Sequence, residues 1–317
     1  MARRRHILMM LRLLTSAVML AVLLTRIHVH DLFPSHRPAA LLWLAGALVV
    51  TVAGIVLSAV RWQYVLRVLE LQSSLSTLLS HYLAGMFVGN FLPSTIGGDV
   101  VRVSRLSANV GETSASLASV VLERLTGWLV LPMITLFALA THPTLLHLGS
   151  ATRLALTLSL GTLVLLVALV AVTASESGGG RFREHPGWLR FAGAVHLGLI
   201  RFRQRPLASG SVLLAGFAYQ LAVVLATWMA AHALGISVGW AAILAFMPAV
   251  AIAQVLPISV GGLGVREAAF VVFLHPLGVA SGQAVALGLA VYAINLTASL
   301  LGAPAFALGS RAVRVAS

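Results

Sequence analysis

The 317-residue chain contains no cysteine and no lysine, so all 21 of its basic residues are arginine. Without cysteine, the chain has no disulfide, no thiolate metal site and no thiol nucleophile. Without lysine, it has no residue that could form a Schiff base. It also lacks the Gly-x4-Gly-Lys-Ser/Thr loop that holds ATP phosphates in P-loop proteins. Direct use of ATP through such a loop is therefore excluded.

Charged residues of both signs are scarce. They make up 9% of the chain, whereas hydrophobic residues make up 59%, and the mean hydropathy is +0.99. A water-soluble domain needs more polar surface than this, so the composition predicts an integral membrane protein. The formal net charge is +13. The arginines are spread along loops between apolar segments, a pattern typical of loops that orient a membrane protein and not of a nucleic-acid-binding face.

Six apolar segments are long enough to cross the bilayer core, which takes about 20 helical residues. We expect full spans at Ile7–Thr25, Ala39–Val60, Ser116–Ala140, Arg153–Thr173, Ser211–Leu234 and Ala284–Leu308. The basic start of the chain resembles a signal peptide. No small-x-small cleavage site follows Leu24, however, so we expect the first span to be retained.

The arginines also predict the orientation of the chain. We expect the chain to lie in a cell membrane (inner or plasma membrane). Six crossings bring both termini to the same face, and the positive-inside rule predicts that this is the cytoplasmic face. The cytoplasmic segments then hold most arginines, Arg61 among them. The outer loops hold only Arg26, Arg37 and Arg153.

Two segments 164 residues apart share one pattern of helix-breaking residues. Asn90–Arg102 and Gln254–Arg266 both read amide, any residue, Leu, Pro, three residues, Gly-Gly, two residues, Val, Arg. A proline followed by Gly-Gly interrupts a helix, and interrupted backbone at membrane depth is tolerated only inside protein or beside a watery cavity. We therefore expect the apolar regions 75–103 and 240–274 to be re-entrant hairpins, each entering and leaving the membrane on one side.

Each hairpin lies between two spans, and the two units have opposite orientations. Residues 39–140 match residues 211–308 as span, hairpin, span, which is the inverted repeat typical of alternating-access transporters. The sequence thus predicts one all-α polytopic membrane domain over residues 1–317, with six full spans and two re-entrant hairpins in an inverted repeat.

A basic linker, expected to be cytoplasmic, joins the two repeats over residues 174–210. Five apolar residues recur there at steps of three and four: Trp188, Phe191, Val195, Leu199 and Phe202. This spacing fits an amphipathic helix at the membrane surface. Because Gly193 and Gly198 weaken a helix, a solvated basic loop is the alternative interpretation.

Six ionisable residues near mid-membrane need a partner or a function, because a charge at the bilayer centre costs roughly 2.5–3.5 kcal/mol. They are Asp99, Arg102, Glu123, Arg124, Arg266 and Glu267. In a structural interpretation, three acids and three arginines form neutralising ion pairs. In a functional one, Arg102 and Arg266 bind a phosphate or another anionic head group, with Asp99 and Glu123 as exchangeable counter-charges. Amide substitutions of these two acids should then alter substrate movement but not protein abundance.

Further candidate residues belong to the same two motifs. The half-helices are expected to restart at two double glycines, where free N–H groups would form an anion site: Gly97, Gly98, Gly261 and Gly262. Three amides lie within apolar sequence and either line the substrate path or bond between helices: Asn90, Gln254 and Asn295. Gly85 and Gly89 have the small-xxx-small spacing of closely packed helices. No two of the 11 histidines have metal-ligand spacing on one helix, and we expect no metal or cofactor.

These motifs resemble the flippase-like family named after the transmembrane region of lysylphosphatidylglycerol synthase. The resemblance rests on Asn90–Arg102, the Glu123-Arg124 pair and Pro257–Phe270, and it covers nearly the whole chain. It implies a polytopic bundle with re-entrant helices that moves or exposes an anionic or aminoacylated lipid between leaflets. Relatives are also linked to export of glycolipids or polyprenyl lipids. Because no soluble aminoacyl-transfer domain follows before Ser317, we do not expect synthase activity.

The sequence therefore favours a translocator of an anionic or phosphate-bearing lipid that is not driven by ATP. Three alternatives remain open: an ion-coupled transporter of a small anionic solute, an enzyme using Asp99 or Glu123 as a base on a lipid-linked phosphate, and a non-transporting lipid-binding subunit. An enzyme is disfavoured, because no nucleophile has a neighbouring base and no carboxylate cluster suits a metal. Expected partners are membrane lipids and a lipid- or sugar-transferring enzyme.

Overall fold

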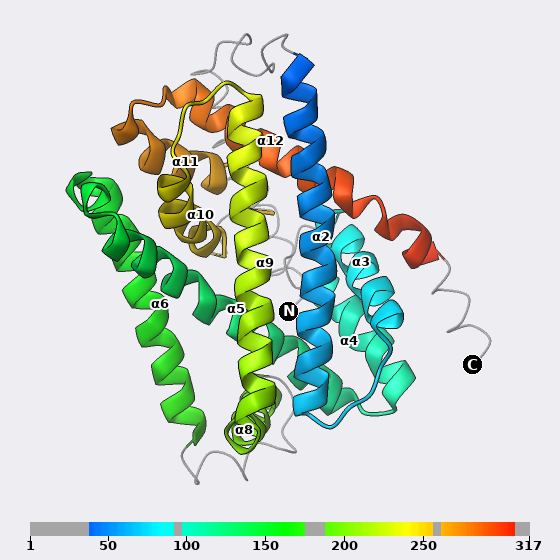
Figure 1. Ribbon diagram of the computed structural model, residues 1–317. Coiled ribbons are helices and arrows are strands. Elements are labelled where there is room, and N and C mark those ends of the chain that lie inside the picture. The colour runs from blue at the N-terminus through cyan, green and yellow to red at the C-terminus, as the bar shows by residue number, and fades with distance from the viewer. Residues whose placement is uncertain (1–37, 92–96, 175–187, 256–260, 308–317) are drawn as a thin grey trace, which may run out of the picture.

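The computed structural model describes residues 38–91, 97–174, 188–255 and 261–307, and every regular element in these ranges is a helix (Figure 1). Five helices are long and apolar enough to cross a membrane: α2 (Pro38–Val68), α5 (Thr113–Thr141), α6 (Ser150–Ala174), α9 (Pro206–Ala233) and α12 (Ser281–Ser299). They correspond to five of the six predicted spans. The sixth, Ile7–Thr25, lies outside the described residues.

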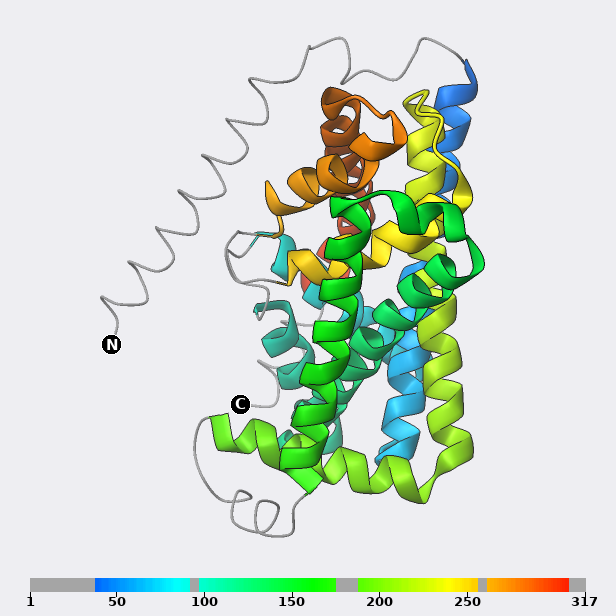
Figure 2. The same cartoon turned by 90° about the vertical axis from the view of Figure 1, so that its left-hand side faces the viewer.

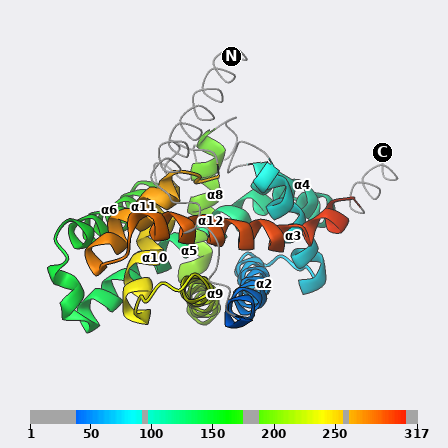
Figure 3. The same ribbon diagram turned by 90° about the horizontal axis from the view of Figure 1, so that it is seen from above.

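Helices α2 and α9 lie side by side along most of their length (Figures 1 and 3). Small residues permit this close approach: Gly54 of α2 faces Ala222 and Tyr219 of α9. Small residues at such a contact let two membrane helices pack closely, and this packing helps to hold helices together in lipid. Helix α5 crosses this pair and then connects, through the short 3-10 helix η2 (Pro143–His147), to α6 on the outside of the bundle.

Each predicted hairpin consists of two short helices on either side of its Leu-Pro motif. The first pair is α3 (Leu75–Phe91) and α4 (Gly97–Val110), and the second is α10 (Trp240–Gln254) and α11 (Val265–Leu274), which continues into η3 (His275–Leu277). Proline cannot donate to the helical hydrogen-bond ladder and disfavours helix in the residue before it, so α3 and α10 end before Pro93 and Pro257. Figure 3 shows the two pairs on opposite sides of α9.

Helix α8 (Trp188–Gln204) lies across one end of the bundle (Figure 2). Arg201 of α8 and Arg205, the N-cap residue of α9, both pair with Glu70, which follows the C-terminal end of α2; the Arg201 Nη1 to Glu70 Oε2 distance is 2.6 Å. Two arginines on one carboxylate leave this end of the protein positively charged.

Three helix boundaries differ from the prediction. Helix α2 continues to Val68 instead of ending near Val60, because no glycine or proline stops it and Arg61 is neutralised inside the protein. Helix α12 ends at Ser299 and not at Leu308, since the chain turns at residues 300–301 where Gly302 packs against α3. Helix α11 begins at Val265, after a turn of three glycines with positive φ.

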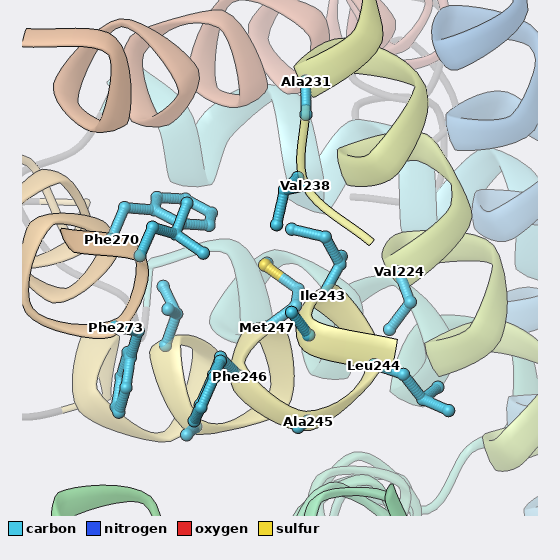
Figure 4. Packing of buried hydrophobic residues seen from close by; sticks show 14 of the residues in the cluster. Val224, Ala231, Val238, Ile243, Leu244, Ala245, Phe246, Met247, Phe270 and Phe273 are labelled. Carbon is cyan, nitrogen blue, oxygen red and sulfur yellow. The ribbon is translucent and has the colours of Figure 1, made fainter. Parts of the chain in front are cut away.

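Two apolar clusters hold these helices in place. The larger joins α10 and α11 to their neighbours, and in it Phe246 stacks on Phe273 with ring centroids 5.2 Å apart (Figure 4). The smaller gathers around Trp62 and Leu66 of α2 and Leu106 of α4. Because all these side chains are fully buried, they fix the two helix pairs on either side of the polar residues described below.

Close packing of α3 on α4 leads to a first testable prediction. Gly98 lies against Gly85 and Gly89, and a Cβ on Gly98 would overlap the carbonyl oxygen of Gly85. We expect Gly98→Ala to destabilise the protein by about 1–3 kcal/mol, because the two backbones must separate. Thermal unfolding in detergent measures this loss.

A matched substitution in α6 is the control. A Cβ on Gly161 would meet no atom within 4 Å. Gly161→Ala should therefore be neutral or stabilise the helix by up to about 1 kcal/mol. Equal effects of the two substitutions would contradict the close contact between α3 and α4.

Candidate functional site

Glu123 is the centre of a buried ion-pair network. Its side chain comes from α5 and is only 2% exposed. One carboxylate oxygen accepts from Arg61 of α2, and the other accepts from Nη1 of Arg102 of α4 at 3.1 Å. Ser58 Oγ lies 3.3 Å from the first oxygen. A single carboxylate therefore ties three helices together and compensates two buried guanidinium groups.

A second carboxylate, Asp99, continues the network toward the surface. It lies in the first turn of α4, where the helix dipole favours a negative charge. Arg124 of α5 binds it with two nitrogens, Nε at 2.5 Å and Nη2 at 2.9 Å. Nη1 of Arg102 is 3.5 Å away from it. The Arg124 side chain is 45% exposed, so this pair, unlike that of Glu123, is partly open to its surroundings.

The network has one more positive than negative charge, because three arginines face two carboxylates. Two members have unused buried donors among the described residues, Nε and Nη1 of Arg61 and Nε and Nη2 of Arg102. Of these two arginines, only Arg102 lines the larger cavity described below. Trp62 and Tyr82 cover the guanidinium plane, with ring centroids 4.2 and 4.6 Å from its central carbon. The planar edge that remains suits an anionic oxygen, which forms strong charge-assisted hydrogen bonds with arginine.

Arg61 is a member of this network that the sequence reasoning missed. It was expected in a cytoplasmic segment, one residue past the end of a span, but it is 4% exposed and bound to Glu123. The unbroken helical sequence from Arg61 to Glu70 was the available signal, since no glycine or proline ends the span there.

The second hairpin has a separate, self-contained pair. Arg266 and Glu267 are both buried, and Arg266 Nε lies 3.1 Å from Glu267 Oε1. The other oxygen of Glu267 accepts the N–H of Gly264 at 2.6 Å and so caps α11. The expected restart of the half-helix at Gly261 and Gly262 is therefore wrong: the helix begins at Val265, and its own glutamate occupies its N-terminus.

A cavity of about 900 Å³, here called cavity 1, opens beside the Glu123 network. One part of its wall is polar and contains Asp99, Arg102 and Arg124. Another part is apolar and is formed mainly by α5: Leu117, Val120, Val121, Leu125 and Trp128. The cavity thus offers guanidinium groups and a hydrocarbon surface to the same occupant.

A smaller space of about 340 Å³, here called cavity 2, lies between α2, α9, α10 and α12 and contains Arg266 in its wall. The two cavities share five lining residues: Tyr82, Met86, Asn90, Gln254 and Gly261. The amides that begin the two repeated motifs therefore lie where the cavities adjoin.

The predicted site residues divide into two groups. Nine line a cavity: Asn90, Gly98, Asp99, Arg102, Arg124, Gln254, Gly261, Gly262 and Arg266. Three others line neither cavity: Glu123 and Glu267 neutralise arginines, and Gly97 begins α4. Gly98 packs against α3, so its missing side chain serves helix contact. Within the described ranges, no group of three or more histidine or acidic side chains could hold a metal ion.

Comparison with known proteins adds a family assignment. The family model described as the lysylphosphatidylglycerol synthase TM region matches residues 9–302, which is nearly the whole chain. No curated protein and no solved structure gives a significant match.

Proposed function

Because the chain belongs to the family of the lysylphosphatidylglycerol synthase transmembrane region, we propose that it binds an anionic, phosphate-bearing lipid and moves it between membrane leaflets without ATP. The chain is a multi-pass helical membrane protein with five apolar helices of spanning length in its described part. Membership of the family supports a lipid-related role, and the geometry of cavity 1 supports the more specific proposal.

The combination of charge and apolar surface in cavity 1 carries this proposal. A lipid phosphate would bind at the unused donors of Arg102 and at Arg124, while an acyl chain would lie along the apolar wall of α5. A transporter of a small soluble anion needs the arginines but has no use for the hydrocarbon surface. The apolar wall therefore favours a lipid over a soluble anion.

We further propose that the two helix pairs are re-entrant hairpins in an inverted repeat with six spans. The α8 end of the bundle, where Arg67, Arg201, Arg203 and Arg205 gather, would face the cytoplasm of a cell membrane with both termini. Helix α8 would then lie on the anionic inner leaflet.

Cavity 1 reaches the same end of the bundle through Ser104 and Thr113, both exposed. With this proposed orientation, cavity 1 would be open toward the cytoplasmic leaflet. Rocking of one repeat against the other would open the site to the outer leaflet, as in other inverted-repeat transporters.

Reconstitution tests the proposed translocation. The vesicles contain the full chain and a trace of phosphatidylglycerol that carries a fluorophore on its acyl chain. A membrane-impermeant reductant destroys the fluorophores of the outer leaflet only. We expect nearly all fluorescence to be lost, because the protein brings labelled lipid from the inner leaflet to the outer one. Protein-free vesicles should keep the inner-leaflet share, and so should vesicles made with heat-denatured protein. The same assay is repeated with labelled lipids that have other anionic head groups. If none of these lipids shows a protein-dependent loss of fluorescence, the proposal is wrong.

A further inference from the structure

The wall of cavity 2 contains several amide and hydroxyl groups. Four side-chain amides line it: Asn90, Gln220, Gln254 and Asn295. Each amide carries both donors and acceptors, which matches hydroxyl groups that also donate and accept. At about 340 Å³, the cavity is at the lower end of the roughly 300–1,000 Å³ typical of ligand pockets. Its size and lining suit a small polar head group and not an acyl chain.

The charge in cavity 2 is balanced before any ligand binds. Arg266 is the only charged residue in its wall among the described residues, and Glu267 neutralises it. Arg266 Nη2 is nonetheless buried and without a hydrogen-bond partner in the described part of the chain. An unpaired buried donor costs free energy, so it favours a ligand oxygen at this position. Because the pair is neutral, an uncharged oxygen such as a hydroxyl satisfies it without an excess charge.

A cationic head group finds no suitable partner here. The carboxylates nearest the two cavities, Asp99, Glu123 and Glu267, are all bound to arginine. Three tyrosine rings line cavity 2, and a guanidinium already lies over each: Arg102 is 4.6 Å from Tyr82, Arg61 is 5.3 Å from Tyr219, and Arg266 is 5.0 Å from Tyr292. No carboxylate lines cavity 2 among the described residues, and each of its tyrosine rings already has one cation beside it, so an ammonium group would find no partner of opposite charge there.

We propose that the two cavities together recognise a phospholipid whose phosphodiester has an uncharged polyhydroxyl head group, such as glycerol, inositol or a hexose, and that they disfavour heads with an ammonium group. The phosphate binds in cavity 1 at Arg102 and Arg124. The head enters cavity 2 past the shared residues Asn90 and Gln254. This inference rests on the proposed lipid-binding function and names its substrate class.

Binding of three lipids to the full-length protein in detergent tests the proposal. The probes are phosphatidylglycerol, phosphatidylethanol and lysyl-phosphatidylglycerol with identical acyl chains. Phosphatidylethanol has the same single negative charge as phosphatidylglycerol but no hydroxyl group on its head. We expect phosphatidylglycerol to bind about tenfold more tightly than phosphatidylethanol, the factor that one or two net hydrogen bonds supply. Equal affinities for these two lipids, or tighter binding of lysyl-phosphatidylglycerol, would overturn the proposal.

Variants in the wall of cavity 2 locate the effect. Gln220→Leu and Asn295→Leu should reduce the preference for phosphatidylglycerol to about twofold or less and leave phosphatidylethanol binding unchanged. Gln72→Leu, at an exposed position outside both cavities, is the matched control and should keep the full preference. A preference that survives both cavity variants would place the head group elsewhere and refute the assignment. The comparison of lipids on the unmodified chain remains decisive if a variant does not fold.

Binding and translocation can fail independently. If the lipids bind with the expected preference but vesicles show no translocation, the proposed flippase activity is wrong and the recognition of polyhydroxyl heads stands. If vesicles translocate phosphatidylglycerol and phosphatidylethanol equally, and the two bind equally, the recognition proposal is wrong and the lipid-moving function stands.

Discussion

Replacing Glu123 by glutamine is expected to destabilise the folded protein by about 3–5 kcal/mol. The substitution removes the one carboxylate that binds both Arg61 and Arg102, whose side chains are 5% and 6% exposed. Two guanidinium groups would then remain buried with much less compensating charge, and water cannot solvate them at that depth. Size-exclusion chromatography of the detergent-solubilised protein should show little monodisperse material, and the thermal midpoint of what remains should fall.

Glu112→Gln in the same polypeptide segment is the matched control. Glu112 lies at the N-cap position of α5, is exposed, and makes no side-chain capping hydrogen bond. Its substitution should leave yield and thermal midpoint within experimental error. A Glu123→Gln protein as abundant and as stable as Glu112→Gln would show that the buried network contributes little to folding.

This expectation separates two acids that the sequence treats alike. In the functional interpretation, Asp99 and Glu123 were both exchangeable counter-charges whose amide variants fold normally, whereas in the structural interpretation both were parts of neutralising ion pairs. Burial now distinguishes them, because Asp99 is 18% exposed and its partner Arg124 is 45% exposed. The burial of Glu123 supports the interpretation that it forms neutralising ion pairs. Asp99 remains the candidate for an exchangeable counter-charge.

Local sequence was sufficient to predict most of the helices. Apolar length predicted all five helices of spanning length in the described ranges, and the Leu-Pro motifs predicted where α3 and α10 end. These features depend on residues close together in the chain. Gly85 and Gly89 likewise indicated close helix packing, which their contact with Gly98 confirms. The orientation of the spans and the inverted repeat remain predictions.

The partners of the buried charges could not be predicted in the same way. Glu123 pairs with Arg61, which is 62 residues away and was expected to be in water. Only the packing of α2 against α5 brings the two together. In the sequence, three intramembrane acids were matched by three arginines, so the predicted charges were already balanced. Nothing therefore indicated that Arg61 would be a fourth buried arginine. The positive charge left in the network is a property of the tertiary structure.

The two repeated motifs also differ more in structure than in sequence. The pattern aligns Gly97 with Gly261, but α4 begins at its glycine whereas α11 begins at Val265. The additional Gly264 adopts φ of 84°, a conformation that favours glycine, and it extends the turn. Glu267 then caps the helix, while the first motif places Asp99 in the first turn of α4. Arg266 is consequently neutralised within its own hairpin. Arg102 instead belongs to a network that also includes charged residues of α5 and α2.

Arg124→Gln is expected to lower the translocation of phosphatidylglycerol and the affinity for it by about tenfold to a hundredfold. Charge-assisted hydrogen bonds contribute about 1.5–3 kcal/mol, and each 1.4 kcal/mol is a factor of ten. Folding should be affected much less than in Glu123→Gln, because Arg124 is 45% exposed and Asp99 keeps Arg102 3.5 Å away as a second partner. The vesicle assay and detergent binding measure the loss, and the thermal midpoint verifies the fold.

Two further substitutions define what Arg124 contributes. Arg124→Lys keeps the charge but loses the planar guanidinium group that can donate two parallel hydrogen bonds. Its affinity for phosphatidylglycerol should therefore lie between those of the native protein and Arg124→Gln. Arg153→Gln, in exposed sequence at the start of α6 and outside both cavities, should behave like the native protein. Unchanged affinity in a folded Arg124→Gln protein would exclude a role for Arg124 in binding the lipid.

The loss in Arg124→Gln should have a second cause that a double substitution can reveal. Without Arg124, the carboxylate of Asp99 lies closest to Arg102, whose Nη1 is already 3.5 Å away. Asp99 would then compete with the lipid phosphate for the guanidinium edge. Adding Asp99→Asn removes this competitor and should restore part of the affinity. If the double variant binds phosphatidylglycerol no better than Arg124→Gln alone, Asp99 is not the counter-charge that an incoming phosphate displaces.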